Sequence, residues 1–296
     1  MSTGLPAVTV VGSINLDIIA TTDRLPTAGE TIGGGVLQQQ PGGKGANQAV
    51  AAARLGGSAR MIGAVGNDAQ GRLMLEALSS AGVDTADVAV LDGDATGTAL
   101  IVVDRDGENQ IVVCPGANSA FSLEGVEFQP DETVLCQLEV GLDVVLEAAR
   151  KSSRFFVLNA APAMDLPAEL LERCDLVIVN ETEYELIPAL VNAKLIAVTY
   201  GKDGSAMFER GRKVAEAPAA AVKVANTIGA GDAFCAALVL ALRSGLDYTR
   251  ALAVANAVGA DAVGDPSSQP ALALLQDYVA LTTNAADAGQ RIVLSE

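Results

Sequence analysis

The chain alternates short apolar runs with segments of helical spacing. Ala7–Ile14 is a continuous apolar run, which is typical of a central parallel strand covered on both faces. Further apolar runs predict strands at 60–65, 134–138, 155–159, 175–179 and 194–199. Helical spacing and glycine stops predict helices at 44–55, 68–81 and 233–242. This βα alternation predicts an α/β fold with a mostly parallel central sheet.

Two segments interrupt that alternation with β-rich patterns. Residues 15–42 hold few helix signals and include a glycine triplet, so they predict small antiparallel strands. Residues 96–103 and 109–113 predict a hairpin around the polar turn at 104–107. We expect these segments, about 15–42 and 96–114, to form a small β lid on a single domain that spans residues 1–296.

Composition excludes several classes of function. The 296 residues carry a net charge of −17 with only 19 Lys and Arg, and no basic cluster is visible, so we expect no nucleic-acid partner. The chain has no histidine, which excludes His-based triads and His-ligated zinc. Any acid–base chemistry must therefore use Asp, Glu, Lys or Cys.

The cysteines and the N-terminus indicate a cytoplasmic protein. Cys114, Cys136, Cys174 and Cys235 lie in apolar stretches with no Cys-x-x-Cys spacing, so we expect reduced core thiols in a reducing compartment. Asn15 and Asp17 interrupt the first apolar run, and the other runs are short, so we expect neither a signal peptide nor a membrane span.

The most informative segment is Asn226-Thr-Ile-Gly-Ala-Gly-Asp232, which precedes an apolar helix. Gly229 and Gly231 allow a sharp turn that points several N–H groups at one place, and the helix dipole favours an anion there. A carboxylate at an anion site is unusual, unless Asp232 takes a proton from a hydroxyl that attacks phosphorus. An ordinary glycine-rich turn capped by Asp is the alternative.

Other strand ends carry polar motifs. The segment Pro41-Gly-Gly-Lys-Gly-Ala-Asn47 opens a helix and brings a cation and an amide, but a helix start with an exposed lysine explains it equally well. Asn15-Leu-Asp17 suits sugar hydroxyls, or else turn formation.

Three further strand ends follow the same pattern, with turns or caps as the alternative in each: Gln137-Leu-Glu139, Asn180-Glu-Thr-Glu183 and Thr199-Tyr-Gly-Lys-Asp-Gly204. Ligands of parallel sheets gather at the carboxyl ends of the strands. Polar or glycine motifs at five strand ends therefore predict one ligand site along that edge.

These motifs together resemble the PfkB carbohydrate kinase family over Val8 to about Ala271. The resemblance rests mainly on the block Gly42-Gly-Lys-Gly-Ala-Asn47-Gln-Ala-Val and on Thr227-Ile-Gly-Ala-Gly-Asp232. It implies a ribokinase-like three-layer α/β fold with a β-rich lid that often pairs two copies into a homodimer. It also implies transfer of a phosphoryl group from ATP, with Mg²⁺, to the primary hydroxyl of a sugar, most simply the 5-position of D-ribose.

The resemblance implies a role for each matching position. Asp232 matches the catalytic base, beside an anion hole of Gly229, Ala230 and Gly231. The sugar-binding positions are Asn15, Leu16, Asp17, Gly43, Lys44, Gly45, Ala46, Asn47 and Glu139, together with Asp232. The nucleotide-binding positions are Asn180, Thr199, Tyr200, Gly201, Lys202, Asp203, Gly204, Gly231 and Asn256. Glu183 matches a residue that holds magnesium through water.

The chain departs from the family in three places. The family's monovalent-cation site maps to Asn226, Ile228, Ala262, Asp265 and Ser267. Asn226 stands where the family has Asp, and near the C-terminus Ala271 replaces a serine and Asp265-Pro266 a basic segment. We therefore hypothesise weak or absent potassium activation. Thirdly, only about ten residues separate Glu183 from Lys194, so we expect the nucleotide side of the sheet to be partly uncovered.

Three functions remain open at this stage. The first is an ATP-dependent kinase for D-ribose, and the second is a PfkB kinase for fructose, 2-deoxyribose or a nucleoside. The third is a non-catalytic sugar-binding paralogue, against which the retained Asp232 argues. A Rossmann dehydrogenase is disfavoured, because the first strand leads into Gly12-Ser-Ile-Asn15 and not into Gly-x-Gly-x-x-Gly.

Overall fold

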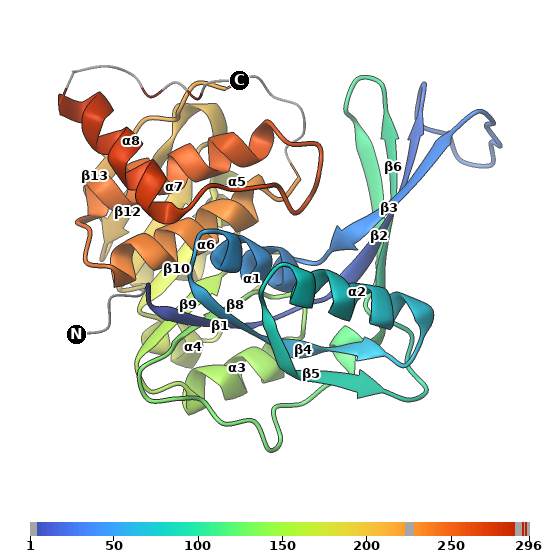
Figure 1. The fold of residues 1–296 in the computed structure, drawn as a ribbon, viewed down its shortest axis with the longest axis horizontal. Coiled ribbons are helices and arrows are strands. Elements are labelled where there is room, and N and C mark those ends of the chain that lie inside the picture. Colours follow the sequence, from blue (N-terminus) through green and yellow to red (C-terminus); the bar gives the residue numbers. More distant parts are fainter. Residues whose placement is uncertain (1–4, 223–227, 288–291, 293, 295–296) are drawn as a thin grey trace.

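A nine-stranded sheet forms the centre of the molecule and a separate four-stranded sheet projects from one end of it (Figure 1). The structure is a computed structural model that describes residues 5–222, 228–287, 292 and 294. The large sheet has the spatial order β13 (Arg212–Ala217), β12 (Ser205–Glu209), β11 (Leu195–Thr199), β10 (Leu176–Asn180), β9 (Phe155–Asn159), β8 (Thr133–Cys136), β1 (Ala7–Val11), β4 (Ser58–Gly66) and β5 (Asp84–Leu91). Its strands pair in parallel except for β12 and β13, which are antiparallel at one edge.

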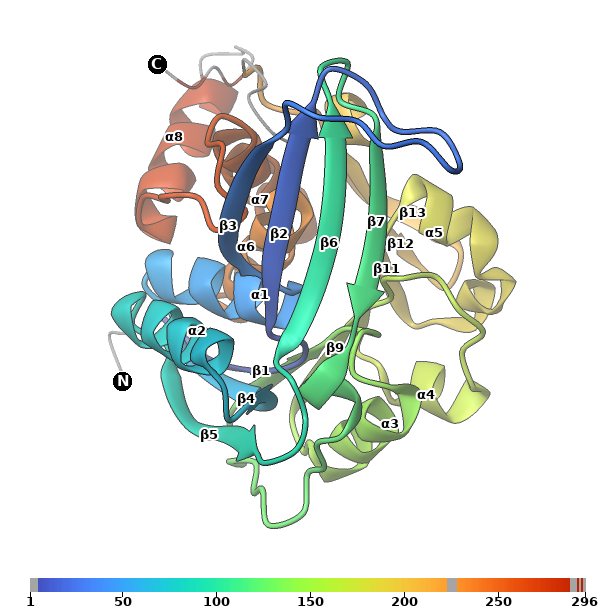
Figure 2. The ribbon, with the colours of Figure 1, turned by 90° about the vertical axis from the view of Figure 1, so that its right-hand side faces the viewer.

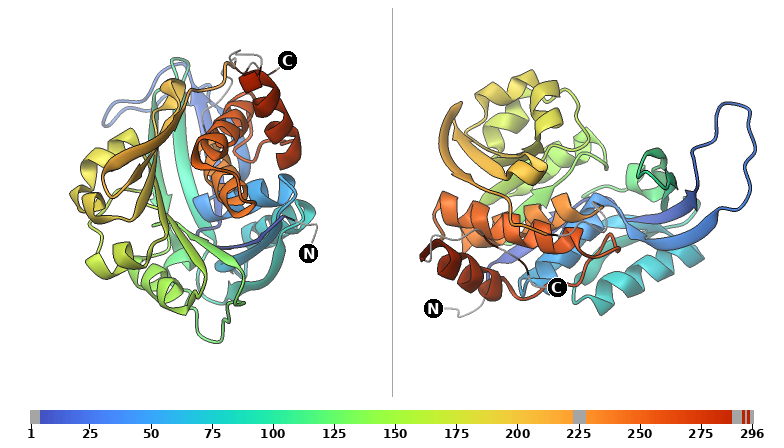
Figure 3. Two further views of the ribbon diagram at one scale, coloured as in Figure 1. Left: turned by 90° about the vertical axis from the view of Figure 1, so that its left-hand side faces the viewer. Right: turned by 90° about the horizontal axis from the view of Figure 1, so that it is seen from above.

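Helices cover both faces of this sheet, which confirms the three-layer α/β prediction (Figures 1 and 3). One face packs against α1 (Lys44–Arg54), α2 (Ala69–Ser80), α6 (Ala230–Arg243), α7 (Tyr248–Val263) and α8 (Leu275–Asp287). The other packs against α3 (Leu142–Lys151), α4 (Ala168–Arg173), α5 (Glu181–Leu186) and the 3-10 helices η1 (Gly116–Ser119) and η2 (Pro188–Asn192). A third 3-10 helix, η3 (Gly201–Asp203), follows β11.

Strand alternation explains why the apolar runs are continuous. In β1, Val10 packs into the core on the α1 and α6 side, whereas the next residue, Val11, packs into the core on the α3 side. Successive side chains of a strand point to opposite faces, so a strand covered on both faces must be apolar at every position. The predicted central strands therefore appear close to their expected ranges.

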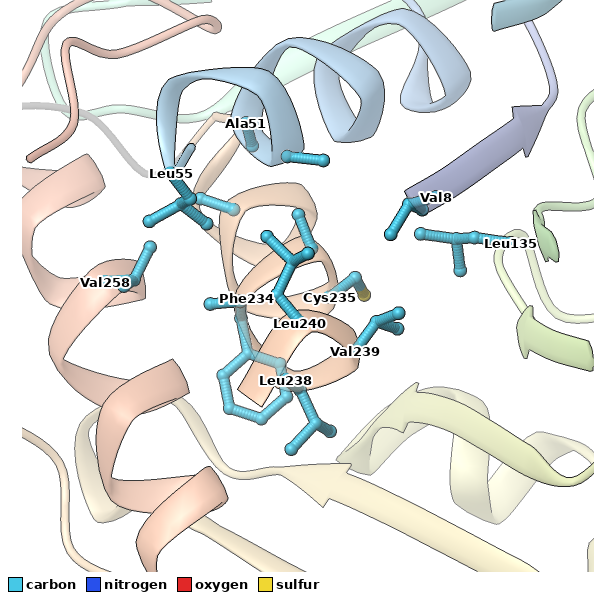
Figure 4. Packing of buried hydrophobic residues seen from close by; sticks show 14 of the residues in the cluster. Val8, Ala51, Leu55, Leu135, Phe234, Cys235, Leu238, Val239, Leu240 and Val258 are labelled. Carbon is cyan, nitrogen blue, oxygen red and sulfur yellow. The ribbon is translucent and has the colours of Figure 1, made fainter. Parts of the chain in front are cut away.

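Helix α6 is buried along almost its whole length between the sheet, α1 and α7 (Figure 4). Leu238, Val239 and Leu240 are each fully buried. Small alanines let the neighbouring helices approach closely, so α6 packs tightly between them. The first turn of α6 begins at Gly229 and contains Asp232.

The four-stranded sheet is the predicted lid, with the order β3 (Val36–Gly42), β2 (Asn15–Thr22), β6 (Gly97–Asp104) and β7 (Asn109–Cys114). Figure 2 shows it face-on in front of the body. The register places Asp17 beside Ala99, and Ala99 opposite Val113, on one face of the lid. Leu100 and Val112 pair on the other face.

Two strand predictions need correction. The strand expected over Ala7–Ile14 ends at Val11. Asn15 and Asp17 lie on β2, within the segment expected to form the lid, so the alternative of turn formation at these residues is not observed. Strands β5, β12 and β13 were not predicted. They lie at or next to the edges of the large sheet, where half-exposed side chains give a weaker apolar signal.

The cysteine prediction is right for three residues and wrong for Cys114. Cys136, Cys174 and Cys235 are buried, and burial raises the pKa of the Cys174 thiol to about 12, so it stays protonated. Cys114 is exposed because it ends β7, an edge strand of the lid whose six residues are all exposed.

The short segment after Glu183 does cover the sheet, contrary to expectation. α5 is followed at once by η2, and Ile187 and Leu190 are each 1% exposed against the sheet face. Val179 and Val198 beneath them are also buried. A bend between two short helices thus supplies the apolar contacts that a longer helix would provide.

Candidate functional site

Two adjoining cavities lie at the carboxyl edge of the large sheet. The first cavity, of about 350 Å³, opens between the strand ends and the lid, and the second, of about 580 Å³, lies between β11 and α7. Thr199, Gly231 and Phe234 line both of them. The start of α6 is therefore the place where the two cavities meet.

Most of the predicted site residues come together here. Those that line the first cavity are Asn15, Asp17, Gly43, Lys44, Asn47, Glu139, Asn180, Glu183, Thr199, Ile228, Gly229, Gly231 and Asp232. Those that line the second are Thr199, Gly201, Lys202, Gly204, Ala230, Gly231 and Asn256.

Five of the predicted sugar- and nucleotide-binding residues line neither cavity, and neither do Ala262, Asp265 and Ser267 of the predicted cation site. Leu16 alternates with Asn15 and Asp17 on β2 and is buried away from the first cavity. Gly45 and Ala46 pack behind Lys44, where a Cβ at Gly45 would lie 2.6 Å from the backbone of Gly12. Tyr200 and Asp203 are also absent from both linings.

Asp232 lies in the first turn of α6 and is 8% exposed. Its Oδ2 accepts a hydrogen bond from Asn47 Nδ2 at 3.1 Å and its Oδ1 accepts one from Gln48 Nε2 at 2.9 Å. Burial raises its pKa, whereas Lys44 and the two amides oppose this shift, and the net pKa lies above the usual value. Asp232 is thus a buried carboxylate with above-average affinity for a proton.

The backbone before Asp232 forms an N–H-rich turn. Gly229 has φ 79°, a left-handed conformation that favours glycine, and a Cβ there would lie 2.2 Å from Ser268 O. The first N–H groups of α6 have no partner within the helix, and the helix dipole adds positive potential at this end. The turn can therefore hold an anionic oxygen where the two cavities meet.

Lys44 brings a cation to the same point. It begins α1, and its backbone N–H donates to Glu139 Oε2 at 3.1 Å, which anchors the helix start to the segment after β8. Burial lowers the pKa of the Lys44 ammonium, but Asp232, Glu139 and Glu183 more than offset this, so its pKa lies above the usual value. Lys44 therefore stays charged at neutral pH.

Asn15 and Asp17 project from β2 into the first cavity. Asn118 was not predicted, yet it holds Asn15: its Nδ2 donates to Asn15 Oδ1 at 2.8 Å, and its Oδ1 accepts from Ile14 N at 2.9 Å. Burial, with help from Glu139 and Asp232, raises the pKa of Asp17 to about 7.

Asn180 and Glu183 cap α5 reciprocally. Asn180 Oδ1 accepts from Glu183 N at 2.8 Å, and Glu183 Oε2 accepts from Asn180 N at 2.8 Å. The cap holds both side chains at the rim of the first cavity, with the Asn180 NH₂ group and the second Glu183 oxygen outside the cap.

Asn256 supports the second cavity. Its Oδ1 accepts from Ser205 Oγ at 2.9 Å, and its Nδ2 donates to the carbonyls of Ala217 and Pro218 at 3.0 Å. Both polar atoms of the amide are thus engaged by the protein, which fixes the loop after β13 as a wall of the cavity.

The expected monovalent-cation site is only partly described. Asn226 lies outside the described residues. The Asp265 carboxylate accepts from the backbone of Ser267 and Ala271 at 2.8 and 3.1 Å, and Ser267 Oγ donates to Gln269 O at 3.2 Å. These hydrogen bonds stabilise the loop at residues 265–271, and the potassium hypothesis stays a prediction.

Three buried glutamines were also missed. Gln48, Gln137 and Gln269 form hydrogen bonds in the interior beneath Asp232. Gln48 immediately follows Asn47 in the Gly42 block, and Gln137 opens the strand-end motif Gln137-Leu-Glu139, so both stood in recognised motifs but were given no role. Nothing in the sequence marks Gln269.

The family model of the pfkB family carbohydrate kinases matches residues 6–273. The chain belongs to this family. It is 38% identical over 263 residues to a ribokinase of Bacillus subtilis, which covers 83% of this chain and 89% of that protein. It is 32% identical over 303 residues to a deoxyribokinase of Salmonella typhi, covering 93% and 99%.

A solved structure agrees. Arabidopsis thaliana ribokinase complexed with ribose and ATP superposes with a TM-score of 0.84 at 31% identity, covering 94% of this chain and 99% of that one. The fold is therefore ribokinase-like, and this pfkB-family protein is an ATP-dependent carbohydrate kinase. No helix among the described residues is long and apolar enough to span a membrane.

The raised pKa of Asp17 predicts a pH-dependent stability. Between its usual pKa of 3.8 and its folded pKa of about 7, the folded state binds the proton more tightly, so the free energy of unfolding falls as pH rises through that window. Asp17→Asn should remove this fall, which amounts to at most about 3 kcal/mol between pH 5 and pH 8. Urea unfolding at pH 5 and pH 8 measures it.

Asp23→Asn is the matched control, because Asp23 is exposed on the chain just after the same strand. It removes the same charge and should leave the pH dependence of the wild type in place. An equally steep fall for Asp17→Asn would show that Asp17 ionises as freely in the folded state as in the unfolded state.

Proposed function

We propose that this pfkB-family kinase phosphorylates the primary hydroxyl of a pentose, D-ribose to D-ribose 5-phosphate, with ATP as donor. The observation that carries this proposal is the position of Asp232 where two cavities meet, beside Lys44 and an N–H-rich turn. One cavity suits a sugar and the other a nucleotide, so the reacting groups would meet at that carboxylate.

The first cavity has the chemistry of a monosaccharide site. Asn15, Asp17, Asn47 and Glu139 supply amide and carboxylate groups that pair with sugar hydroxyls, and all four line the cavity. The lid contributes an apolar wall of Ala99, Ile101, Ile111 and Val113. The similarity to a ribokinase structure complexed with ribose and ATP supports ribose as the occupant.

The transfer step uses Asp232 as the base. Its carboxylate takes the proton of the 5-hydroxyl as that oxygen bonds to the γ-phosphorus. The bond between this phosphorus and the β,γ-bridging oxygen breaks, and ADP leaves with the electron pair. Lys44 and the N–H groups of Ala230 and Gly231 stabilise the negative charge on the transferring oxygens.

The second cavity would hold the nucleotide. Its walls are small and apolar around Ala219, Ala220, Val222 and Gly259, which leaves room for a planar base. Gly201 and Gly204 permit close approach of the backbone at the end of β11. The phosphates would then extend past Gly231 into the first cavity.

Mg²⁺ fits the residues present only as an ion carried largely by the nucleotide. Among the described residues no group of three or more His, Cys, Asp or Glu is placed to hold a metal. Mg²⁺ commonly keeps several waters and uses few protein carboxylates, so Glu183 would hold it through water. Bound there, the ion would neutralise phosphate charge.

Two alternatives remain. The similarity to a deoxyribokinase favours 2-deoxyribose as a second candidate substrate, and fructose or a nucleoside would require a different fit to the lid. A non-catalytic sugar-binding protein is the other alternative, although it would have no use for a buried Asp232. We place the protein in the cytoplasm, where ATP is available and cysteines stay reduced.

The decisive experiment is an ADP-release assay with Mg·ATP across ribose, 2-deoxyribose, fructose and nucleosides. We expect the highest kcat/KM with ribose. Asp232→Asn should lower kcat by roughly 10²–10⁴-fold, because it removes the general base, with little change in the affinity for ribose.

Ribose binding by calorimetry is the control that the variant is folded. Near-normal turnover by Asp232→Asn would exclude Asp232 as the base. Sugar binding by the wild type without ADP release on any substrate would favour the non-catalytic alternative.

We expect weak or absent activation by potassium. Asn226 and Ala271 stand where the family has an Asp and a Ser, so two side-chain ligands of a monovalent ion are lost or neutralised. Turnover in KCl should exceed turnover in NaCl at the same ionic strength little or not at all. A strong rise in KCl would refute this.

A second copy of the chain is the partner we propose for the lid. On the face turned away from the first cavity, Leu37, Leu100 and Val112 are 65%, 45% and 61% exposed. Such a set of exposed apolar side chains is costly in water, and packing two lids together would cover it.

The protein should therefore elute as a dimer in size-exclusion chromatography with light scattering. Leu100→Asp with Val112→Asp should shift it to monomer, whereas Glu108→Lys at the exposed hairpin turn changes charge and should not. A monomeric wild type at micromolar concentration would contradict the proposed dimer.

A further inference from the structure

Two amide chains converge on the carboxylate of Asp232. One oxygen accepts from Asn47 Nδ2 at 3.1 Å and the other from Gln48 Nε2 at 2.9 Å. Each of these amides is in turn held by a second one. Gln269 Nε2 donates to Asn47 Oδ1 at 3.3 Å, and Gln137 Nε2 donates to Gln48 Oε1 at 2.5 Å.

The outer amides decide which way the inner amides face. A side-chain amide has an acceptor oxygen on one side and an NH₂ donor group on the other, so a 180° rotation exchanges the positions of the two. With Gln137 donating to its oxygen, Gln48 must turn its NH₂ group toward Asp232 and toward Asn159 Oδ1, which accepts at 3.0 Å. Gln269 fixes Asn47 in the same way. All orientations agree with one another only if Asp232 is the acceptor.

The orientation of the Gln137 amide leaves its own oxygen without a hydrogen bond among the described residues. Gln137 is fully buried, and its Oε1 has no hydrogen-bond partner in the described structure. This oxygen faces Gly12, where a Cβ would lie 1.9 Å from it. An unsatisfied buried acceptor is destabilising, so it is expected only where the opposite end of the side chain has a role.

We propose that Gln137 and Gln269 are positioning residues that hold Asn47 and Gln48 with their NH₂ groups on Asp232, which keeps this carboxylate ionised and aimed. The proposal rests on the proposed role of Asp232 as base. Neither glutamine lines the first cavity, so each acts only through another side chain.

Burial raises the pKa of Asp232, whereas the two inner amide donors lower that pKa. The charged or titratable side chains that influence this site from the surrounding elements are Lys44 on α1, Asp17 on β2, Glu139 after β8, Glu183 on α5 and Cys235 on α6. Lys44 is the one cation among them, so loss of an amide donor leaves few groups that favour the ionised form.

The chain of Gln269 also couples a distant loop to the base. Gln269 lies between α7 and α8, next to Ser268, whose carbonyl packs against Gly229 and whose Oγ donates to Pro41 O at 2.5 Å. The Arg54 guanidinium donates to the carbonyls of Gln269 and Pro270. The loop is thus fixed from α1 and in turn fixes Asn47.

The test is the pH profile of kcat at saturating sugar and ATP. Gln137→Leu and Gln269→Leu free the inner amides to flip, so the pKa of Asp232 should rise. The pKa of the acid limb of the kcat profile should rise by about one pH unit. At pH values below this limb, kcat should be about tenfold lower than in the wild type, with little change in KM. Gln137→Met, which keeps the volume, should behave alike.

Thr9→Val is the matched control. It removes a different buried hydrogen bond, from Thr9 Oγ1 to Glu132 Oε2 at 2.6 Å, far from the cavities. It should lower Tm without moving the acid limb. If the glutamine variants lower Tm likewise and leave the acid limb in place, they are ordinary core residues and the proposal is wrong.

A second readout needs no activity. Because the folded pKa of Asp232 lies above its unfolded value, its ionisation lowers the free energy of unfolding as pH rises. Gln137→Leu should make this fall between pH 5 and pH 8 steeper, and it should have no such effect in the Asp232→Asn background. An unchanged fall overturns the proposal, even if no sugar is phosphorylated and the proposed function itself fails.

Discussion

The burial of one carboxylate constrains the rest of the site. Asp232 is 8% exposed, and an unpaired charge in such a place is costly enough to neutralise itself. One cation, Lys44, and two amide donors, Asn47 and Gln48, stabilise the ionised carboxylate. Both amides belong to α1, the helix that Lys44 begins. The start of α1 and the start of α6 must therefore meet at one point, and the central strands, the lid and the C-terminal loop are arranged around that meeting.

Glycine makes this meeting possible. A Cβ at Gly45 would lie 2.6 Å from the backbone of Gly12 and Ser13, so α1 can begin against the end of β1 only without one. A Cβ at Gly42 would lie 2.2 Å from the Asp17 carboxylate, which ties the lid to the same helix start. At α6, Gly229 allows contact with Ser268. Close backbone approach, more than side-chain contact, sets the distances between the reacting groups.

The sequence predicted the site best where one local motif marks the start of a helix and also contains a reactive side chain. Glycines followed by Lys44 or Asp232 mark helix starts, so both helices and both residues were predicted. Asn15 and Asp17 were recognised as ligands at the start of the predicted lid segment, but the first strand was extended to Ile14, because an apolar run does not show where a strand leaves one sheet for another. Gln269 could not be predicted, since its bond to Asn47 spans 222 residues and depends on how a C-terminal loop folds back.

The charges that line the first cavity follow from the same constraint. Among its described lining residues, Lys44 is the one cationic side chain, against the carboxylates of Asp17, Glu139, Glu183 and Asp232. Burial, with smaller contributions from the neighbouring Glu139 and Asp232 carboxylates, raises the pKa of Asp17 to about 7. A neutral sugar adds no charge to this balance, whereas a nucleotide triphosphate adds several negative ones. The proposed entry of ATP together with Mg²⁺ is consistent with this balance, because a divalent cation neutralises part of the triphosphate charge.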